Sequence, residues 1–143
     1  MRAKEYLQQI EKLTIKIRQR EDQLICLRET AGGAAAIRYD KVQIQQTVQA
    51  DAMERNVLKM VELESQIIAD KIRMESLKNQ IIEQIQALDD KRYMDILYLK
   101  YVKFKPYYEI AERMKYDYSY VRCLHGEALG YFETKYADSI AQS

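Results

Sequence analysis

Two long stretches of the chain carry apolar residues at alternating spacings of three and four, the repeat that puts side chains on one face of a coiled-coil helix. In the first stretch, residues 3–29, the repeat consists of Ile10, Leu13, Ile17, Leu24 and Leu27. In the second, residues 52–88, it consists of Met60, Leu63, Ile67, Met74, Leu77, Ile81 and Leu88. We therefore predict two long helices that form an antiparallel hairpin, a dimeric coiled coil, or both.

The second of these helices has a wider apolar stripe than one partner helix needs, which indicates more than one neighbour. The additional residues are Val57, Val61, Ile68, Ile72 and Ile85. Polar residues interrupt both repeats, at Arg20 in the first and at Asp70 and Gln84 in the second. We expect an acid such as Asp70 or Glu64 to meet Arg20 and to fix the register or the pairing of the helices.

Gly32 and Gly33 predict the end of the first helix, because glycine readily adopts the left-handed conformation of a helix C-terminus. Residues 31–51 are Gln-rich and weakly patterned, and we expect a long, partly mobile connection there. The run VQIQQTV alternates apolar and polar residues, so a short strand is the alternative.

The whole composition favours an all-α protein. Four Gly and one Pro in 143 residues are too few for a sheet-rich fold, which needs a turn about every 8–12 residues. We expect a helical hairpin or coiled coil over residues 1–88 and a separate helix-turn-helix domain over residues 89–143. Cys26 and Cys123 belong to no motif, and no apolar run approaches the roughly 18 residues of a membrane span. A cytoplasmic protein with reduced thiols is expected.

The segment AERMKYDYSYVRCLH, residues 111–125, reads better as two helices than as one. Asp89 or Asp90 caps a preceding helix, and Pro106 can begin the next one. That next helix would end at Met114, and Asp117 would cap a second helix over residues 118–132. The residues expected to face inward are Ile110, Met114, Tyr116, Val121 and Leu124. The tyrosines expected in the core are Tyr93, Tyr101, Tyr108 and Tyr116.

The two-helix reading gives a helix-turn-helix, whose second helix enters the major groove of DNA with its N-terminal part. The residues predicted to read bases are Tyr118, Ser119, Arg122, Cys123 and Gly126. Arginine can make two hydrogen bonds to guanine, serine can donate or accept, and cysteine can touch a thymine methyl. The residues predicted to hold DNA phosphates are Lys103, Lys105, Arg113, Lys115 and Tyr120.

Charge permits this role without requiring it. Residues 91–131 hold eight Lys and Arg against five Asp and Glu, whereas the whole chain has a net charge of +1. The sequence has no Gly-rich phosphate loop, no nucleophile elbow and no metal-ligand spacing around its single His125. We expect no enzyme, no cofactor, no metal and no small-molecule substrate.

The segment LDDKRYMDILYLKYVKFKPYYEIAERMKYDYSYVRCLHGEALGYF resembles region 4 of bacterial sigma factors, through ILYLKYV, YYEIAERM and YSYVRCLHGEAL. The whole chain is similar to the small sigma-region-4-like proteins of phages and prophages of Gram-positive bacteria, including the ArpU-type and RinA-type late transcriptional regulators. The resemblance implies duplex DNA recognition by the last full helix, contact with RNA polymerase, and a place in the bacterial host cytoplasm. No segment matches the sigma region that binds the −10 element, so a complete sigma factor is not expected.

Three functions remain open on the sequence. The first is a DNA-binding transcriptional regulator that forms a homo-oligomer, preferably a dimer, or contacts a partner through its N-terminal helices. The second is a DNA-packaging protein similar to small terminase subunits, which form rings. The third is an interaction protein whose degenerate helix-turn-helix binds RNA polymerase or another protein.

Overall fold

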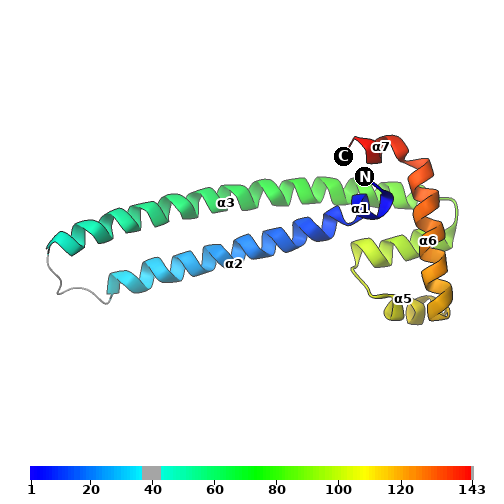
Figure 1. Cartoon of the computed structure of the whole chain (residues 1–143), viewed down its shortest axis with the longest axis horizontal. Coiled ribbons are helices and arrows are strands. Elements are labelled where there is room, and N and C mark those ends of the chain that lie inside the picture. Colours follow the sequence, from blue (N-terminus) through cyan, green and yellow to red (C-terminus); the bar gives the residue numbers. More distant parts are fainter. Residues whose placement is uncertain (37–42, 143) are drawn as a thin grey trace. The chain divides into compact units, whose positions relative to one another are not determined.

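A computed structural model describes residues 1–36 and 43–142, and the side chains of residues 1–30 and 51–142. Every regular element in these ranges is helical, which confirms the all-α fold (Figure 1). The elements are α1 (Ala3–Leu7), α2 (Gln9–Ala36), α3 (Gln43–Gln86), α4 (Lys91–Leu97), the π-helix η1 (Tyr98–Val102), α5 (Tyr107–Met114), α6 (Tyr118–Lys135) and α7 (Ala137–Ala141). None of the helices described combines the length and apolarity that crossing a membrane requires.

The predicted end of the first helix at Gly32 and Gly33 was wrong, because α2 continues through both glycines to Ala36. The predicted connection over residues 31–51 is helical at its beginning and from Gln43 onward, so the described residues 43–48 of the alternating run are helical and not a strand. Residues 37–42 lie outside the described part of the chain. Alanine and glutamine are good helix formers, and their abundance on both sides offsets the cost of about 1 kcal/mol for each glycine.

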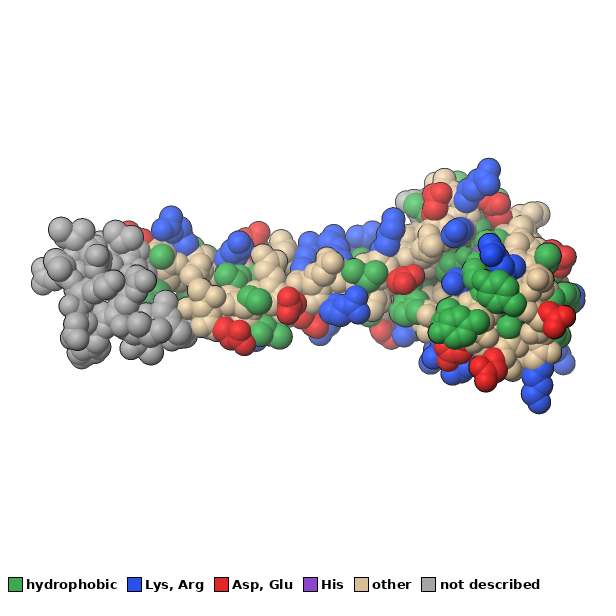
Figure 2. Space-filling model, turned by 60° about the horizontal axis from the view of Figure 1, so that its bottom comes forward, with side chains coloured by type: hydrophobic (Ala, Val, Ile, Leu, Met, Phe, Trp, Pro, Cys, Tyr) green, Lys and Arg blue, Asp and Glu red, His purple; other side chains and the backbone are tan. Residues whose placement is uncertain are grey.

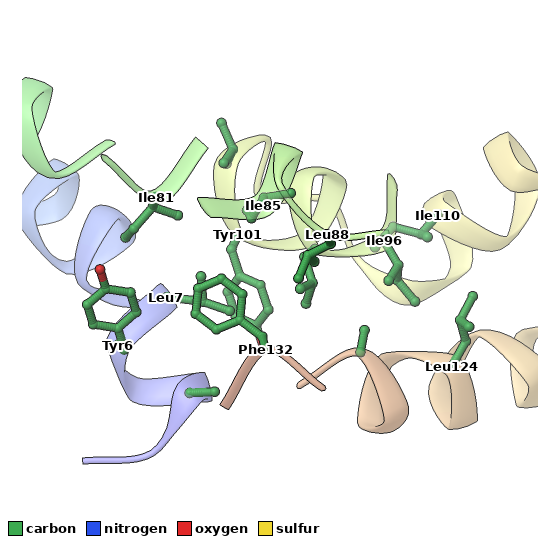
Figure 3. Packing of buried hydrophobic residues seen from close by; sticks show 14 of the residues in the cluster. Tyr6, Leu7, Ile81, Ile85, Leu88, Ile96, Tyr101, Ile110, Leu124 and Phe132 are labelled. Carbon is green, nitrogen blue, oxygen red and sulfur yellow. The ribbon is translucent and has the colours of Figure 1, made fainter. Parts of the chain in front are cut away.

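The contacts divide the chain into two compact units, residues 15–73 and residues 1–14 together with 74–143. We had expected a boundary near residue 88. The division falls elsewhere because α1 and the last turns of α3 supply core to the C-terminal helices. Figure 3 shows Tyr6 and Leu7 of α1 and Ile81 and Ile85 of α3 converging on Phe132 of α6.

In the unit of residues 15–73, α2 and α3 pack through a small core of Leu24, Leu63 and Ile67, with Leu27 and Met60 beside it. Arg20 donates a hydrogen bond to Asp70, which confirms the expected meeting of the two polar residues. Glu64, the other candidate acid, instead bonds Arg28.

In the unit that contains the C-terminal helices, Asp90 caps α4, and its carboxylate accepts from the Arg92 backbone N–H at 2.9 Å. The helix of residues 107–114 and a second helix beginning at Tyr118 are both confirmed. Lys115 ends α5 in the left-handed conformation, with φ of 58°. Asp117 occupies the N-cap position of α6, although its side chain makes no capping bond. Helix α6 continues past the predicted end at residue 132 to Lys135, and neither η1 nor α7 was anticipated.

Candidate nucleic-acid interface

Helix α6 separates its side chains into a buried face and an exposed face. The buried residues are Val121, Leu124, His125, Ala128 and Phe132. The five predicted base-reading residues, Tyr118, Ser119, Arg122, Cys123 and Gly126, are all exposed. The structure therefore brings these five together on the first turns of α6, on the side away from the core.

Small residues keep this exposed face open. A Cβ atom built on Gly126 or on Gly130 would point into open space, with nothing within 4 Å beyond the adjoining backbone of α6. Ser119 and Cys123, which are exposed on the same helix, have only short side chains. A neighbouring molecule can thus approach the backbone of α6 closely along this face.

Arg122 lies over a cluster of aromatic rings. Its guanidinium carbon is 5.6 Å from the ring centre of Tyr107 and 6.0 Å from that of Tyr118. The two tyrosine rings meet edge to face, with centres 6.3 Å apart. Among the ion pairs of the described side chains, none includes Arg122. The tyrosines therefore orient the guanidinium through cation–π contacts without satisfying its hydrogen-bond donors.

Beneath this cluster, His125 is buried between two tyrosine hydroxyls. Its Nε2 lies 2.7 Å from the hydroxyl of Tyr101, and its Nδ1 lies 3.2 Å from that of Tyr107. Burial, together with the positive charges of Lys100, Lys4 and Arg122, lowers the pKa of His125 from 6.5 to about 4. A neutral imidazole has one donor and one acceptor nitrogen, so both hydroxyls can be satisfied. No local sequence pattern signals this network, because the two tyrosines are 24 and 18 residues from His125.

The five predicted phosphate-binding residues differ in how far their side chains are already engaged by other residues. Lys103 and Lys115 are exposed, and neither belongs to an ion pair in the described part of the chain. Lys105 and Arg113 are both 3.5 Å from the carboxylate of Glu109. The remaining residue, Tyr120, is already engaged, since its hydroxyl accepts a hydrogen bond of 2.7 Å from Arg92. Lys103 and Lys115 are thus the members most available to an anion.

Sequence reasoning missed the basic residues at the start of α4. Lys91, Arg92 and Arg113 line a hollow of about 590 Å³, together with Asp95 and Tyr116. Arg92 is held by Asp90 at 2.8 Å. The signal available was the pair of basic residues directly after the helix cap.

The core assignment was wrong for two of the four tyrosines. Tyr108 is 69% exposed and Tyr116 is 37% exposed. Tyr108 lies on the outer side of α5, because its neighbours Ile110 and Ala111 fill the inner side. Tyr116 lies in the turn, and its ring packs against Tyr120 at 4.8 Å instead of facing inward. Of the other two, Tyr101 is buried in the core, and Tyr93 is half-buried and packs against it.

Comparison of the chain with protein-family models, with curated proteins and with solved structures found no match. The features that indicate a function are the side chains of α5, α6 and the turn between them. That surface offers Arg122, short polar and apolar side chains, and nearby Lys103 and Lys115. None of these three basic residues belongs to an ion pair of the described side chains. In the same region, no group of His, Cys, Asp and Glu among the described residues could hold a metal ion.

Proposed function

We propose that this protein is a DNA-binding transcriptional regulator of the phage or prophage type, which reads duplex DNA in the major groove with α6. The observation that carries the proposal is the exposed first half of α6, which follows a three-residue turn and presents Arg122 outside any ion pair of the described residues. A major groove about 12 Å wide admits one α-helix, and an arginine near the N-terminus of that helix is the commonest reader of guanine.

Each residue of the exposed face has a role in this proposal. Arg122 donates two hydrogen bonds to the O6 and N7 atoms of a guanine, and Ser119 bonds a neighbouring base edge. Cys123 contacts a thymine methyl group, and Gly126 lets the helix backbone approach the groove floor. Tyr118 both orients Arg122 and reaches the DNA backbone with its hydroxyl.

Phosphate contacts would come from the turn and from the segment before α5. Lys103 and Lys115 are exposed on those segments. To bind phosphate, Lys105 and Arg113 would have to give up their ion pairs with Glu109. Their contribution to the DNA-binding free energy would be smaller for this reason, because the Glu109 carboxylate would lose both partners. The protein would therefore bind nonspecific DNA weakly and depend on Arg122 for its preferred site.

The exposed tyrosines favour a second candidate, an interaction protein that binds RNA polymerase or another protein. Tyr108 is 69% exposed and Tyr118 is 47% exposed, and tyrosine is enriched at protein interfaces. In this alternative the face of α6 meets a protein surface, and the modest positive charge has no part in binding.

The test uses duplexes that the whole wild-type protein selects from a randomised pool, titrated by fluorescence anisotropy at several salt concentrations. Arg122→Ala should cost about 1–3 kcal/mol on the selected site and relax the preference at one base pair. Arg122→Lys should recover little of this loss, because lysine cannot form the bidentate contact.

Lys115→Ala is the matched control for phosphate binding. It should weaken binding to all sequences alike and reduce the salt slope by about 1. Failure to select any duplex, or binding that neither salt nor Arg122→Ala changes, would refute the DNA-reading proposal and favour the protein-binding alternative.

A further inference from the structure

The α2–α3 pair of residues 15–73 has an apolar groove on one side that nothing in the described part of the chain covers. Ile25 of α2 is 50% exposed and Ile68 of α3 is 60% exposed. Both line a groove of about 410 Å³, with the buried Leu24 and Ile67 at its floor. Figure 2 shows hydrophobic side chains at the surface of the long helices, lying among charged ones.

Four charged residues surround this groove in an alternating pattern. Glu21 of α2 bonds Lys71 of α3 at 2.8 Å, and Arg28 of α2 bonds Glu64 of α3 at 2.5 Å. All four line the groove, and each side chain is between 43% and 56% exposed. Residues seven apart lie two turns apart on the same side of a helix. The sign of the charge therefore alternates along each helix and also across from one helix to the other.

This pattern is complementary to itself under a two-fold rotation. If two such faces meet with the axis across the helices, α2 lies on α2 of the second copy, and Glu21 faces Arg28. If the axis runs along the helices, α2 lies on α3 of the second copy, and Glu21 faces Lys71. In both arrangements each of the four charges meets an opposite charge, and Ile25 meets an isoleucine. A two-fold interface requires this property, because one patch must fit itself.

We propose that this face, defined by Glu21, Ile25, Arg28, Glu64, Ile68 and Lys71, binds the same face of a second copy of the chain. Charge complementarity of this kind selects the partner and fixes the register. Further aliphatic residues extend the apolar surface along α3, since Val57, Val61 and Ile72 are 50%, 59% and 68% exposed. A contact of ordinary size buries about 800 Å² on each partner, which requires such an extension beyond the groove.

The dimer deepens the proposed function, because two copies can read two half-sites of DNA. Its test contains no DNA, so failure of the dimer and failure of DNA reading are distinguishable. We would measure the mass of the whole chain by sedimentation equilibrium from low-micromolar to submillimolar concentrations. The wild type should approach the mass of two chains.

Two charge variants make the test specific to this face. One carries Glu21→Lys with Glu64→Lys, which leaves only positive charges around the groove. The other carries Arg28→Glu with Lys71→Glu, which leaves only negative charges. Each variant alone should dissociate about tenfold or more readily than the wild type, and an equimolar mixture should form a mixed dimer. The matched control is Lys59→Glu with Glu62→Lys, two exposed residues of α3 that do not line the groove, and it should associate as the wild type does.

Circular dichroism shows whether each charge variant keeps its helices. If one unfolds, Ile68→Ser decides instead, because it leaves all four charges in place and removes only an exposed aliphatic side chain. Weaker association of Ile68→Ser would support the proposed face. A monomeric wild type, an assembly of three or more chains, or a dimer that these variants leave unchanged would overturn the proposal.

Discussion

The bond between Arg20 and Asp70 gives a prediction about how α2 and α3 pair. The Asp70 side chain is 13% exposed and that of Arg20 is 24% exposed, so both charges are largely removed from water. Removing one partner of a buried pair costs roughly 3–5 kcal/mol, because the other charge stays buried and unpaired. Partial exposure reduces that cost here, and we expect about 2–3 kcal/mol for Arg20→Leu.

The two single substitutions should differ. In Arg20→Leu, the short carboxylate of Asp70 remains buried on its helix face without a partner. In Asp70→Leu, the long side chain of Arg20 can extend its charged end into water. We therefore expect Asp70→Leu to cost about half as much as Arg20→Leu, and the double variant with leucine at both positions to be as stable as the wild type or more stable.

Urea denaturation of the wild type, the two single variants and the double variant, followed by circular dichroism, measures their free energies of unfolding. The four values together give the coupling energy between Arg20 and Asp70. Costs below about 1 kcal/mol for both single variants would refute the reasoning, because exposed ion pairs are typically worth no more than that. A double variant less stable than either single variant would also refute it. The oligomeric mass should be measured at the same time, because a polar pair on an apolar repeat can fix register and pairing.

Two further predictions concern the core around α6. Phe132 is fully buried, and its ring centre lies 6.0 Å from that of Tyr6 and 4.8 Å from that of Tyr136. Phe132→Ala should therefore lower the free energy of unfolding by about 3–5 kcal/mol, measured by thermal or chemical denaturation. A variant as stable as the wild type would contradict this packing. The pKa of His125 is lowered from 6.5 to about 4, so its neutral form favours the folded state, and stability should fall as the pH decreases from 6.5 through about 4. In His125→Gln this part of the pH dependence should disappear, and its persistence would assign the effect to other groups.

The parts of the fold that the sequence predicted are those that local patterns determine. The 3/4 repeat located α2 and α3, and the only proline with Asp117 placed the starts of α5 and α6. The assignment failed where tertiary contacts decide. Glycine chemistry alone suggested a helix end at Gly32, and aromatic content alone suggested a buried Tyr108. The core that joins Tyr6 to Phe132 links residues more than a hundred positions apart, and no local pattern contains that information.

The candidate site shows the same division between local pattern and tertiary contact. Helical periodicity was enough to put Ser119, Arg122 and Cys123 on one exposed face, since the buried residues of α6 alternate with them. Periodicity could not show that Arg122 lies over Tyr107, because that ring comes from another helix. Spacing could have shown which basic residues are occupied, because Lys105 and Arg113 each lie four residues from Glu109 and both contact its carboxylate.

Tyr107 connects the proposed reading surface to the core. Its hydroxyl contacts His125, while its ring lies 4.2 Å from the ammonium of Lys100 and 5.6 Å from the guanidinium of Arg122. An added positive charge on His125 would lie close to both cations, which is one reason that its pKa is lowered. The neutral imidazole and the oriented guanidinium are therefore parts of one arrangement. A change in the buried residues would move Arg122 although it leaves the exposed face chemically intact, so under the proposed function any sequence preference of α6 would depend on the core beneath it as well as on the exposed residues.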